Sequence, residues 1–139
     1  MFINSSFMKT QYLLSRAMSA ESLRHTVITD NIANVDTPNF KRSEVVFEAE
    51  LERALKSESP YPFKAKLTND RHIPFYQPKD YRKVTPKVSL EYDTSYRNDK
   101  NNVDIDKEMV GAAKSTMRFN SFSSITGRYF RKMNILLRG

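Results

Sequence analysis

Residues 30–42 mark the point at which a long helical pattern stops, and they read Asp-Asn-Ile-Ala-Asn-Val-Asp-Thr-Pro-Asn-Phe-Lys-Arg. A residue that precedes proline is pushed out of the α region, so a helix that reaches this stretch must end by Thr37. Pro38 itself lacks a backbone donor. Asn39 comes next, and asparagine tolerates the left-handed region in which glycine is otherwise needed. The stretch therefore predicts the end of a helix followed by a tight turn.

Upstream of that turn, residues 7–35 contain no glycine or proline. Placed at 100° per residue, their apolar members gather on one side of a helix, with polar Arg24 and Asn31 inside the same stripe. Several members are small, which suits close approach to a neighbouring helix. The predicted packing stripe consists of Leu13, Ala17, Ala20, Val27, Ile28 and Val35, with Leu23 at its edge.

The pattern becomes helical again from Val103 to the C-terminus. The helix macrodipole favours acidic residues in the first turns, and Asp104, Asp106 and Glu108 occupy them. One side of this helix carries a seam of apolar and small residues. A seam of this kind is commonly part of an ordinary core, but the centre of the chain offers little apolar surface for it to pack against. The N-terminal helix is therefore the candidate partner. The seam follows alternating steps of three and four and consists of Met109, Ala112, Thr116, Phe119, Ser123, Thr126, Phe130, Met133 and Leu137.

The centre of the chain is broken, because all six prolines lie between residues 38 and 86. Periodicity predicts a short helix within residues 44–57 and short strands at residues 63–67 and 88–92. Residues 93–102 are polar apart from Tyr96 and predict a flexible linker. The predicted fold is mainly α, with long N- and C-terminal helices pairing in a coiled-coil-like bundle and a small irregular proline-rich central segment containing short strands.

Three divisions follow: an N-terminal assembly helix with its turn (1–43), a central proline-rich segment (44–102) and a C-terminal assembly helix (103–139).

Composition excludes several kinds of chemistry. Three glycines are too few for a phosphate-binding loop or a dinucleotide fingerprint. Zero cysteine removes disulfides, thiolate zinc sites and cysteine nucleophiles. Apolar runs such as Ile135-Leu136-Leu137 are far shorter than the roughly 20 residues that span a bilayer. Residues 1–9 do not look like a cleaved secretory signal. We expect no catalytic residue, no cofactor and no metal site.

The same residues 30–42 resemble the N-terminal signature of bacterial flagellar rod and hook proteins, because two asparagines, an alanine, Thr-Pro, an aromatic and a basic residue fall in register. Residues 101–109 are similar to the second element of that family, which opens the C-terminal helix. Asn39 stands where the family generally has glycine. Within the family, residues 43–48 and 67–73 look like those of the proximal rod members.

The resemblance implies two groups of site residues. The signature turn and subunit contact would comprise Asn31, Ala33, Asn34, Thr37, Pro38, Asn39, Phe40 and Lys41, and the start of the C-terminal helix would comprise Asn102, Asp104 and Glu108.

The resemblance also implies a mechanical role. The chain would be a structural subunit of the flagellar proximal rod that links the inner-membrane ring and the export gate to the rest of the rod and transmits torque through helix packing. Implied partners are copies of itself, the next proximal rod protein FlgC and the adaptor FliE, with no nucleic acid and no direct lipid binding. The implied location is the basal body, at the periplasmic base of the rod, reached by type III export without a cleaved signal peptide.

Two other interpretations remain at this point. Residues 103–139 carry seven basic and three acidic side chains, and cations alternate with aromatics near the C-terminus, so a basic helical module could bind nucleic acid or an anionic membrane surface. A hydrolase with His72 in its active site is a more distant third. His25 falls on a helix flank and is expected at the surface, and neither histidine has a second ligand at metal-binding spacing.

Overall fold

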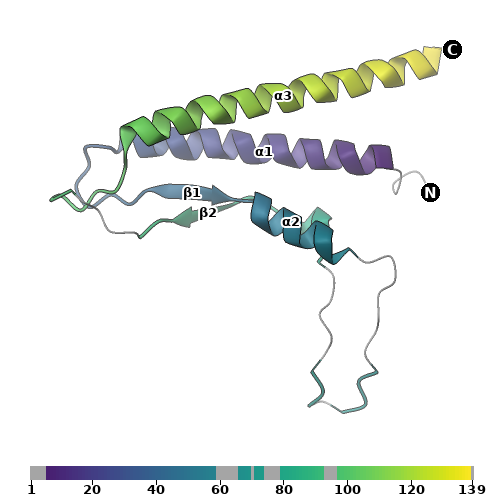
Figure 1. Ribbon diagram of the computed structural model, residues 1–139, viewed down its shortest axis with the longest axis horizontal. Coiled ribbons are helices and arrows are strands. Elements are labelled where there is room, and N and C mark those ends of the chain that lie inside the picture. Colours follow the sequence, from purple (N-terminus) through teal and green to yellow (C-terminus); the bar gives the residue numbers. More distant parts are fainter. Residues whose placement is uncertain (1–5, 59–65, 70, 74–78, 93–96, 139) are drawn as a thin grey trace. The chain divides into compact units, whose positions relative to one another are not determined.

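The computed structural model describes residues 6–58, 66–69, 71–73, 79–92 and 97–138. It confirms a mainly helical fold in which long N- and C-terminal helices pack together and a small two-stranded sheet lies between them in sequence (Figure 1). The chain divides into two compact units, residues 1–45 with 86–139 and residues 46–85. The elements are α1 (Ser6–Ala33), β1 (Ser43–Val46), α2 (Glu48–Ser57), the 3₁₀ helix η2 (Tyr81–Lys83), β2 (Lys87–Leu90) and α3 (Ile105–Arg138).

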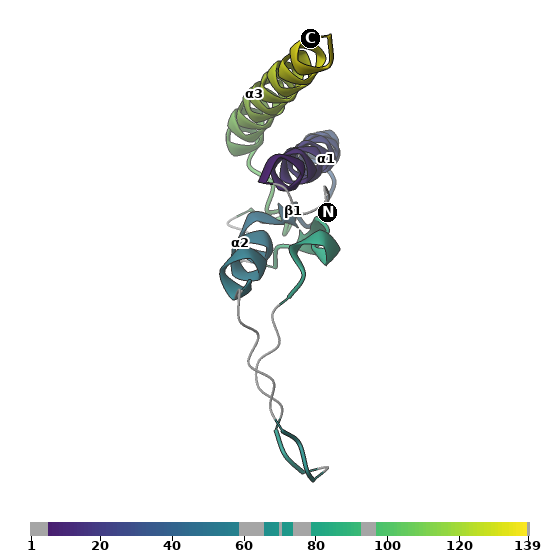
Figure 2. The same cartoon turned by 90° about the vertical axis from the view of Figure 1, so that its right-hand side faces the viewer.

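The first unit is built on the antiparallel pair α1 and α3, which lie side by side in both views (Figures 1 and 2). The end of α1 lies beside the start of α3, where the Asn31 amide donates to Glu108. Near the other end, the rings of Phe7 and Tyr129 meet edge to face with their centroids 5.4 Å apart. The helix of residues 7–35 predicted from the sequence ends at Ala33, before Pro38 as expected.

The core of this unit is small. Its buried apolar residues are Ala20, Val27 and Ile28 of α1 together with Val45 and Val103. Close approach of the helices depends on small side chains at the contact. A Cβ placed on Gly111 would come within 3.4 Å of the Ile28 Cδ1 atom, and the Ser115 hydroxyl donates to the carbonyl oxygen of Glu21 at 3.1 Å.

The face of α3 that meets α1 is displaced by one residue from the predicted seam at several levels. Glu108 and Ser115 are buried, and Phe122 and Tyr129 are half-buried, whereas the predicted seam runs one residue later. A one-residue shift rotates the contact by about 100° around the helix. The polar bonds of Glu108 and Ser115 fix this rotation. Of the predicted packing residues on α3, Ala112 is half-buried, and Met109, Thr116, Phe119, Phe130, Met133 and Leu137 are exposed.

Strands β1 and β2 form a two-stranded sheet and run in opposite directions (Figure 1). Just beyond the strand ends, the Glu91 N–H donates to the Arg42 carbonyl at 2.9 Å. A strand forms where one was predicted at residues 88–92, but it covers Lys87–Leu90 and leaves out Glu91 and Tyr92. The predicted helix of residues 44–57 begins only at Glu48, because Ser43–Val46 pair in the sheet. Residues 63–65 of the other predicted strand lie outside the described residues, and Lys66 and Leu67 are not in a strand.

The second unit contains α2 and η2. Phe47, Ala54, Tyr81 and Val84 are its buried apolar residues. The Ser57 hydroxyl at the end of α2 accepts from the Lys79 N–H at 3.0 Å, which joins two segments that are far apart in sequence.

Candidate assembly site

A cluster of polar side chains joins the turn after α1 to the segment that leads into α3. Its members come from five places in the chain: the last turn of α1, the residue before β1, the residue after β2, the segment that precedes α3 and the first turn of α3. We call this cluster the clasp, and it consists of Asn31, Arg42, Glu91, Asn101, Asn102 and Glu108.

Asn31 is fully buried, at 0% exposure, although it lies in the apolar stripe of α1. Its Oδ1 accepts from the Ser43 N–H at 3.0 Å, and its Nδ2 donates to the Ser43 carbonyl at 2.9 Å. The amide therefore pairs with a backbone residue at two points, as a neighbouring strand would. The same Nδ2 also lies 3.1 Å from the Glu108 Oε2 atom. Asn31 thus ties α1 to both β1 and α3.

Glu108 is the buried carboxylate of the clasp, with 1% of its side chain exposed. Its Oε1 accepts from Arg42 Nε at 2.6 Å, so both of its oxygens have donors. Arg42 Nη1 also donates to Glu91 Oε2 at 2.5 Å. Burial disfavours the charged guanidinium, but its bonds to the two carboxylates outweigh this and raise the pKa of Arg42 above its ordinary value. A buried ion pair is tolerated when its remaining polar atoms are satisfied in this way.

Asn101 corrects the prediction of a flexible linker at residues 93–102. Residues 93–96 lie outside the described residues, but Asn101 is fully buried, at 0% exposure. Its Oδ1 accepts from the Val103 N–H at 2.8 Å. Its Nδ2 lies within hydrogen-bond distance of three carbonyl oxygens, those of Asn34, Val35 and Thr37, at 3.0, 3.0 and 2.9 Å. The Asn101 side chain therefore serves the turn after α1, whereas Asn98 and Lys100 of the same segment are exposed.

The backbone of the turn confirms the expectation for Asn39, whose φ is 63°. Its N–H donates to the Asp99 carbonyl at 2.9 Å. Lys100 also has a positive φ, of 61°, which the sequence did not predict. The Lys100 carbonyl accepts from the Lys41 ammonium at 2.7 Å. Asn39 and Lys100, both with a left-handed backbone conformation, thus lie on two segments that face each other: the turn after α1 and the segment before α3.

Side chains also accept hydrogen bonds from the backbone of the segment that leads into α3. The Asp99 carboxylate accepts from the Asn101 N–H, and hydrogen bonds from Arg97 and then from this N–H lower the pKa of Asp99 below its usual value. Asp104 precedes α3, and its Oδ1 accepts from the N–H groups of Asp106 and Lys107 at 3.1 and 3.3 Å. This is the geometry of a helix N-cap, so the side chain of Asp104 fixes where α3 begins.

Asn102 and Arg42 close the sheet end of the clasp. The Arg42 N–H donates to Asn102 Oδ1 at 2.7 Å, and Asn102 Nδ2 donates to the Glu91 carbonyl at 2.9 Å. Asn102 therefore bridges the residue before β1 and the residue after β2.

The structure brings some of the implied site residues together and leaves others at the surface. Asn31, Asn102 and Glu108 are in the clasp, and Asp104 caps the helix beside it. Asn34, Phe40 and Lys41 are half-buried, whereas Ala33, Thr37, Pro38 and Asn39 are exposed. On α1, Leu13 and Ala17 are half-buried, and Ala20 and Val27 are buried.

Three members of the clasp, Arg42, Glu91 and Asn101, were not singled out from the sequence. Arg42 and Asn101 do fall inside the two segments that carry the family resemblance, so that resemblance was the available signal. Glu91 has no such signal, because its role depends on the pairing of β1 with β2.

The two histidines do not belong to the clasp. His25 is exposed, as expected, and His72 is exposed with its Nδ1 atom 3.4 Å from the Thr68 N–H. No group of three or more potential ligands gathers for a metal ion within the described residues. No helix in the described part of the chain combines the length and the hydropathy of a membrane span. The hydrogen bonds of the clasp join α1, β1 and α3.

Known proteins place this architecture in a family. The family described as Flagella basal body rod protein matches residues 12–41, which include most of α1 and the turn held by the clasp. The flagellar basal body rod protein FlgB of Borrelia hermsii is 43% identical over 91% of this chain and 93% of its own length. The chain belongs to the flagellar basal body rod protein family.

Two more distant relatives extend the likeness. FlgB of Bacillus subtilis is 33% identical over 97% of this chain and 98% of its own length. FlgB of Escherichia coli K12 is 27% identical over 88% of this chain and 89% of its own length. The family resemblance carried by residues 30–42 and 101–109 is thereby confirmed, and the chain is a FlgB-like structural subunit of the flagellar basal body rod.

Proposed function

We propose that the chain is the proximal rod subunit that links the inner-membrane ring and the export gate to the rest of the rod, and that it transmits torque through packed helices. Its partners in this proposal are copies of itself, the next rod protein FlgC and the adaptor FliE. It acts at the periplasmic base of the rod, which it reaches by type III export without a cleaved signal peptide. It performs no catalysis.

One observation carries the mechanical part of the proposal: the clasp holds α1 and α3 together while α3 leaves a long apolar face uncovered. Met109, Phe119, Phe130 and Leu137 are 59%, 40%, 62% and 78% exposed in the single chain. Scattered exposed apolar residues are ordinary, but residues spaced along one helix favour an interaction surface. Burial of such side chains stabilises an assembly by about 25 cal/mol per Å² of apolar area.

The clasp supports the transmission of torque. Its ion pairs and amide hydrogen bonds connect α1, the sheet and α3 through side chains of which Asn31, Asn101 and Glu108 are buried, so a force on one helix is passed to the other without a flexible joint. In this proposal residues 1–43 and 103–139 are the assembly segments, and residues 44–102 form the segment between them.

Phe119→Asp tests the proposal. We expect the variant to be synthesised at a normal level but to abolish rod assembly, because a carboxylate then lies in the apolar face. Phe119→Leu is the matched control and is expected to assemble. The measurement is recovery of the protein in detergent-extracted basal bodies, together with motility. Normal motility of Phe119→Asp would reject the role of this face.

A further inference from the structure

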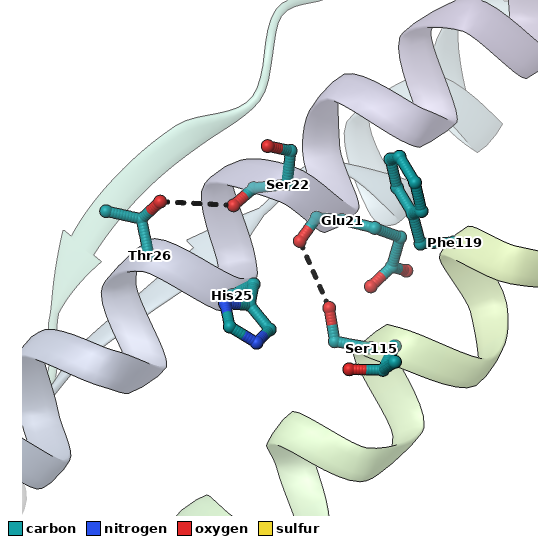
Figure 3. A pocket seen from close by; sticks show the side chains of 7 residues that line it. Glu21, Ser22, His25, Thr26, Ser115 and Phe119 are labelled. Atoms are coloured by element: carbon teal, nitrogen blue, oxygen red, sulfur yellow. Dashed lines mark hydrogen bonds between the residues drawn. The ribbon is translucent and has the colours of Figure 1, made fainter.

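A groove lies between α1 and α3 about halfway along the helix pair and away from the clasp. Its volume is about 310 Å³. Figure 3 shows the Glu21 side chain extending from α1 toward α3, with its carboxylate near Phe119 and Ser115. We call this feature the Glu21 groove, and its lining consists of Glu21, Ser22, His25 and Thr26 of α1 and Ser115, Thr116 and Phe119 of α3.

The carboxylate of Glu21 is incompletely satisfied. The residue is 3% exposed. Its Oε1 accepts from Arg24 Nη1 at 2.6 Å, and Arg118 Nη1 approaches the same oxygen at 3.6 Å, beyond hydrogen-bond distance. Its Oε2 is buried and has no hydrogen-bond partner within the described ranges. Buried charged groups are normally hydrogen-bonded, because an unpaired one is expensive. Glu21 Oε2 therefore lacks a hydrogen-bond donor within the described residues.

Suitable donors are present on α3 itself. After Glu108 this helix carries six cations and no carboxylate. Arg118 is the one that approaches Glu21. The other five form no ion pair with any described residue, and they are Lys114, Arg128, Arg131, Lys132 and Arg138.

The end of α3, residues 128–138, carries its cations on one side of the helix. At 100° per residue, Arg128, Arg131, Lys132 and Arg138 gather on that side with Ile135 between them, and an apolar stripe of Phe130, Met133 and Leu137 lies on the opposite side. Ile135 and Leu137 are exposed, at 71% and 78%. Tyr129 meets Phe7 in the first described turn of α1, so α3 continues past that turn (Figure 1). We call residues 128–138 the α3 end.

The α3 end cannot reach the Glu21 groove of its own chain. Ser115 lies beside Glu21, and Arg131 is sixteen positions further along the same straight helix, a rise of about 24 Å. A donor from this segment must therefore come from another molecule.

We propose that the Glu21 groove is a docking site for a second copy of this chain, whose α3 end places a lysine or arginine against Glu21 Oε2 and Ile135, on the same side of the helix, against Phe119. The proposal rests on the proposed function as a rod subunit, in which copies of the chain are neighbours. Arg118 does not oppose the incoming cation, because its side chain is 56% exposed and can turn into solvent. A hydrogen bond between charged partners is short and strong.

The two surfaces differ, so the contact is heterologous. Each copy offers one groove and one helix end, and a contact of this kind continues from copy to copy until a ring closes or a helical array forms. This matches the needs of a rod, whereas a two-fold contact would stop at a dimer.

Photo-crosslinking in cells tests the contact. The chain, with a photoreactive residue in place of exposed Ser22 at the rim of the groove, replaces the native copy in its own organism. We expect a crosslinked product of twice the chain's mass, whose second peptide comes from residues 128–138 of the other copy. The same residue in place of Lys107, at the far end of α3, is the matched control and is expected to give no such peptide. Crosslinks from position 22 to a different protein, or to another segment of the chain, would overturn the proposal.

Charge variants test the chemistry of the contact. Arg131→Glu with Lys132→Glu is expected to reduce the crosslink from position 22 by about tenfold, since a hydrogen bond to a charged group contributes about 1.5 kcal/mol or more. Glu21→Gln is expected to give a similar loss, with its helix content checked by circular dichroism. Lys107→Glu, a single charge reversal outside the surface, should leave the crosslink unchanged. An unchanged yield in the double variant contradicts the proposal.

Two further readouts separate the alternatives. If the double variant Arg131→Glu with Lys132→Glu loses the binding of the purified chain to phosphatidylglycerol vesicles but keeps the crosslink from position 22, the cations bind a membrane surface and the docking proposal is wrong. If deletion of the gene leaves motility normal, the rod function itself is contradicted. A chain that restores motility but does not crosslink as expected refutes only the docking contact.

Discussion

Asn101→Ala should be the most damaging single amide substitution in the clasp. The Asn101 side chain is fully buried, donates toward three carbonyl oxygens of the turn after α1 and accepts from the Val103 N–H. An amide nitrogen has two hydrogens, so the three acceptors share two donated bonds. The substitution therefore removes two donated bonds and one accepted bond.

The magnitude follows from that count. Each net intramolecular hydrogen bond contributes about 1 kcal/mol, so the expected decrease in the free energy of unfolding is about 3 kcal/mol. The decrease is larger if water cannot reach the abandoned carbonyl groups. Asn101→Asp keeps the acceptor for Val103 but turns an oxygen toward the three carbonyls, so it should be at least as destabilising.

Urea unfolding followed by far-UV circular dichroism measures the effect, with hydrogen exchange of the Val103 amide as a local probe. Asn98→Ala is the matched control, because Asn98 lies on the same segment and is exposed. A decrease of less than about 0.5 kcal/mol for Asn101→Ala, the range of an ordinary surface substitution, would refute the account of the clasp.

Other perturbations probe the same segment. Lys100→Gly should raise the free energy of unfolding by about 0.5–1 kcal/mol, because the removal of left-handed strain at φ 61° outweighs the entropy cost of glycine. Lys100→Ala keeps the strain and is the control. An equal gain for the alanine variant in urea unfolding would contradict this explanation. Asp99 has a lowered pKa in the folded chain, so its stabilisation is present above the unfolded value near 3.8 and is lost as the pH falls through the folded value. Asp99→Asn should therefore have a urea midpoint that depends less on pH between about pH 5 and pH 2 than that of the unsubstituted chain, and parallel curves would show that Asp99 is not coupled to folding.

The elements that could be predicted from the sequence are those with local causes. The end of α1 follows from the steric restriction before Pro38, and the left-handed Asn39 follows from the tolerance of asparagine for positive φ. The alternation at Val88 and Leu90 likewise predicted a strand. Each of these features depends on neighbours in the sequence.

Features that depend on distant partners could not be predicted in this way. The polar segment containing Asn101 was interpreted as a linker, because nothing local shows that its amide meets the carbonyls of Asn34 and Thr37. The rotation of α3 was missed for a similar reason. Helical periodicity favoured the apolar seam through Met109, but the carboxylate of Glu108 meets the amide of Asn31, and these buried polar bonds decide which side of α3 faces α1.

The sequence separation within the clasp determines when the chain can fold. Asn31 and Glu108 are 77 positions apart, and Arg42 and Glu108 are 66 positions apart. Contacts between such distant residues form late, since they must first overcome the entropy of closing a long loop. A chain that emerges N-terminus first, from a ribosome or from a narrow channel, therefore has no clasp until residue 108 has appeared. The first helix stays without its intramolecular partner during that interval, so the polypeptide remains flexible enough to pass through a narrow channel and becomes rigid only when its last quarter arrives.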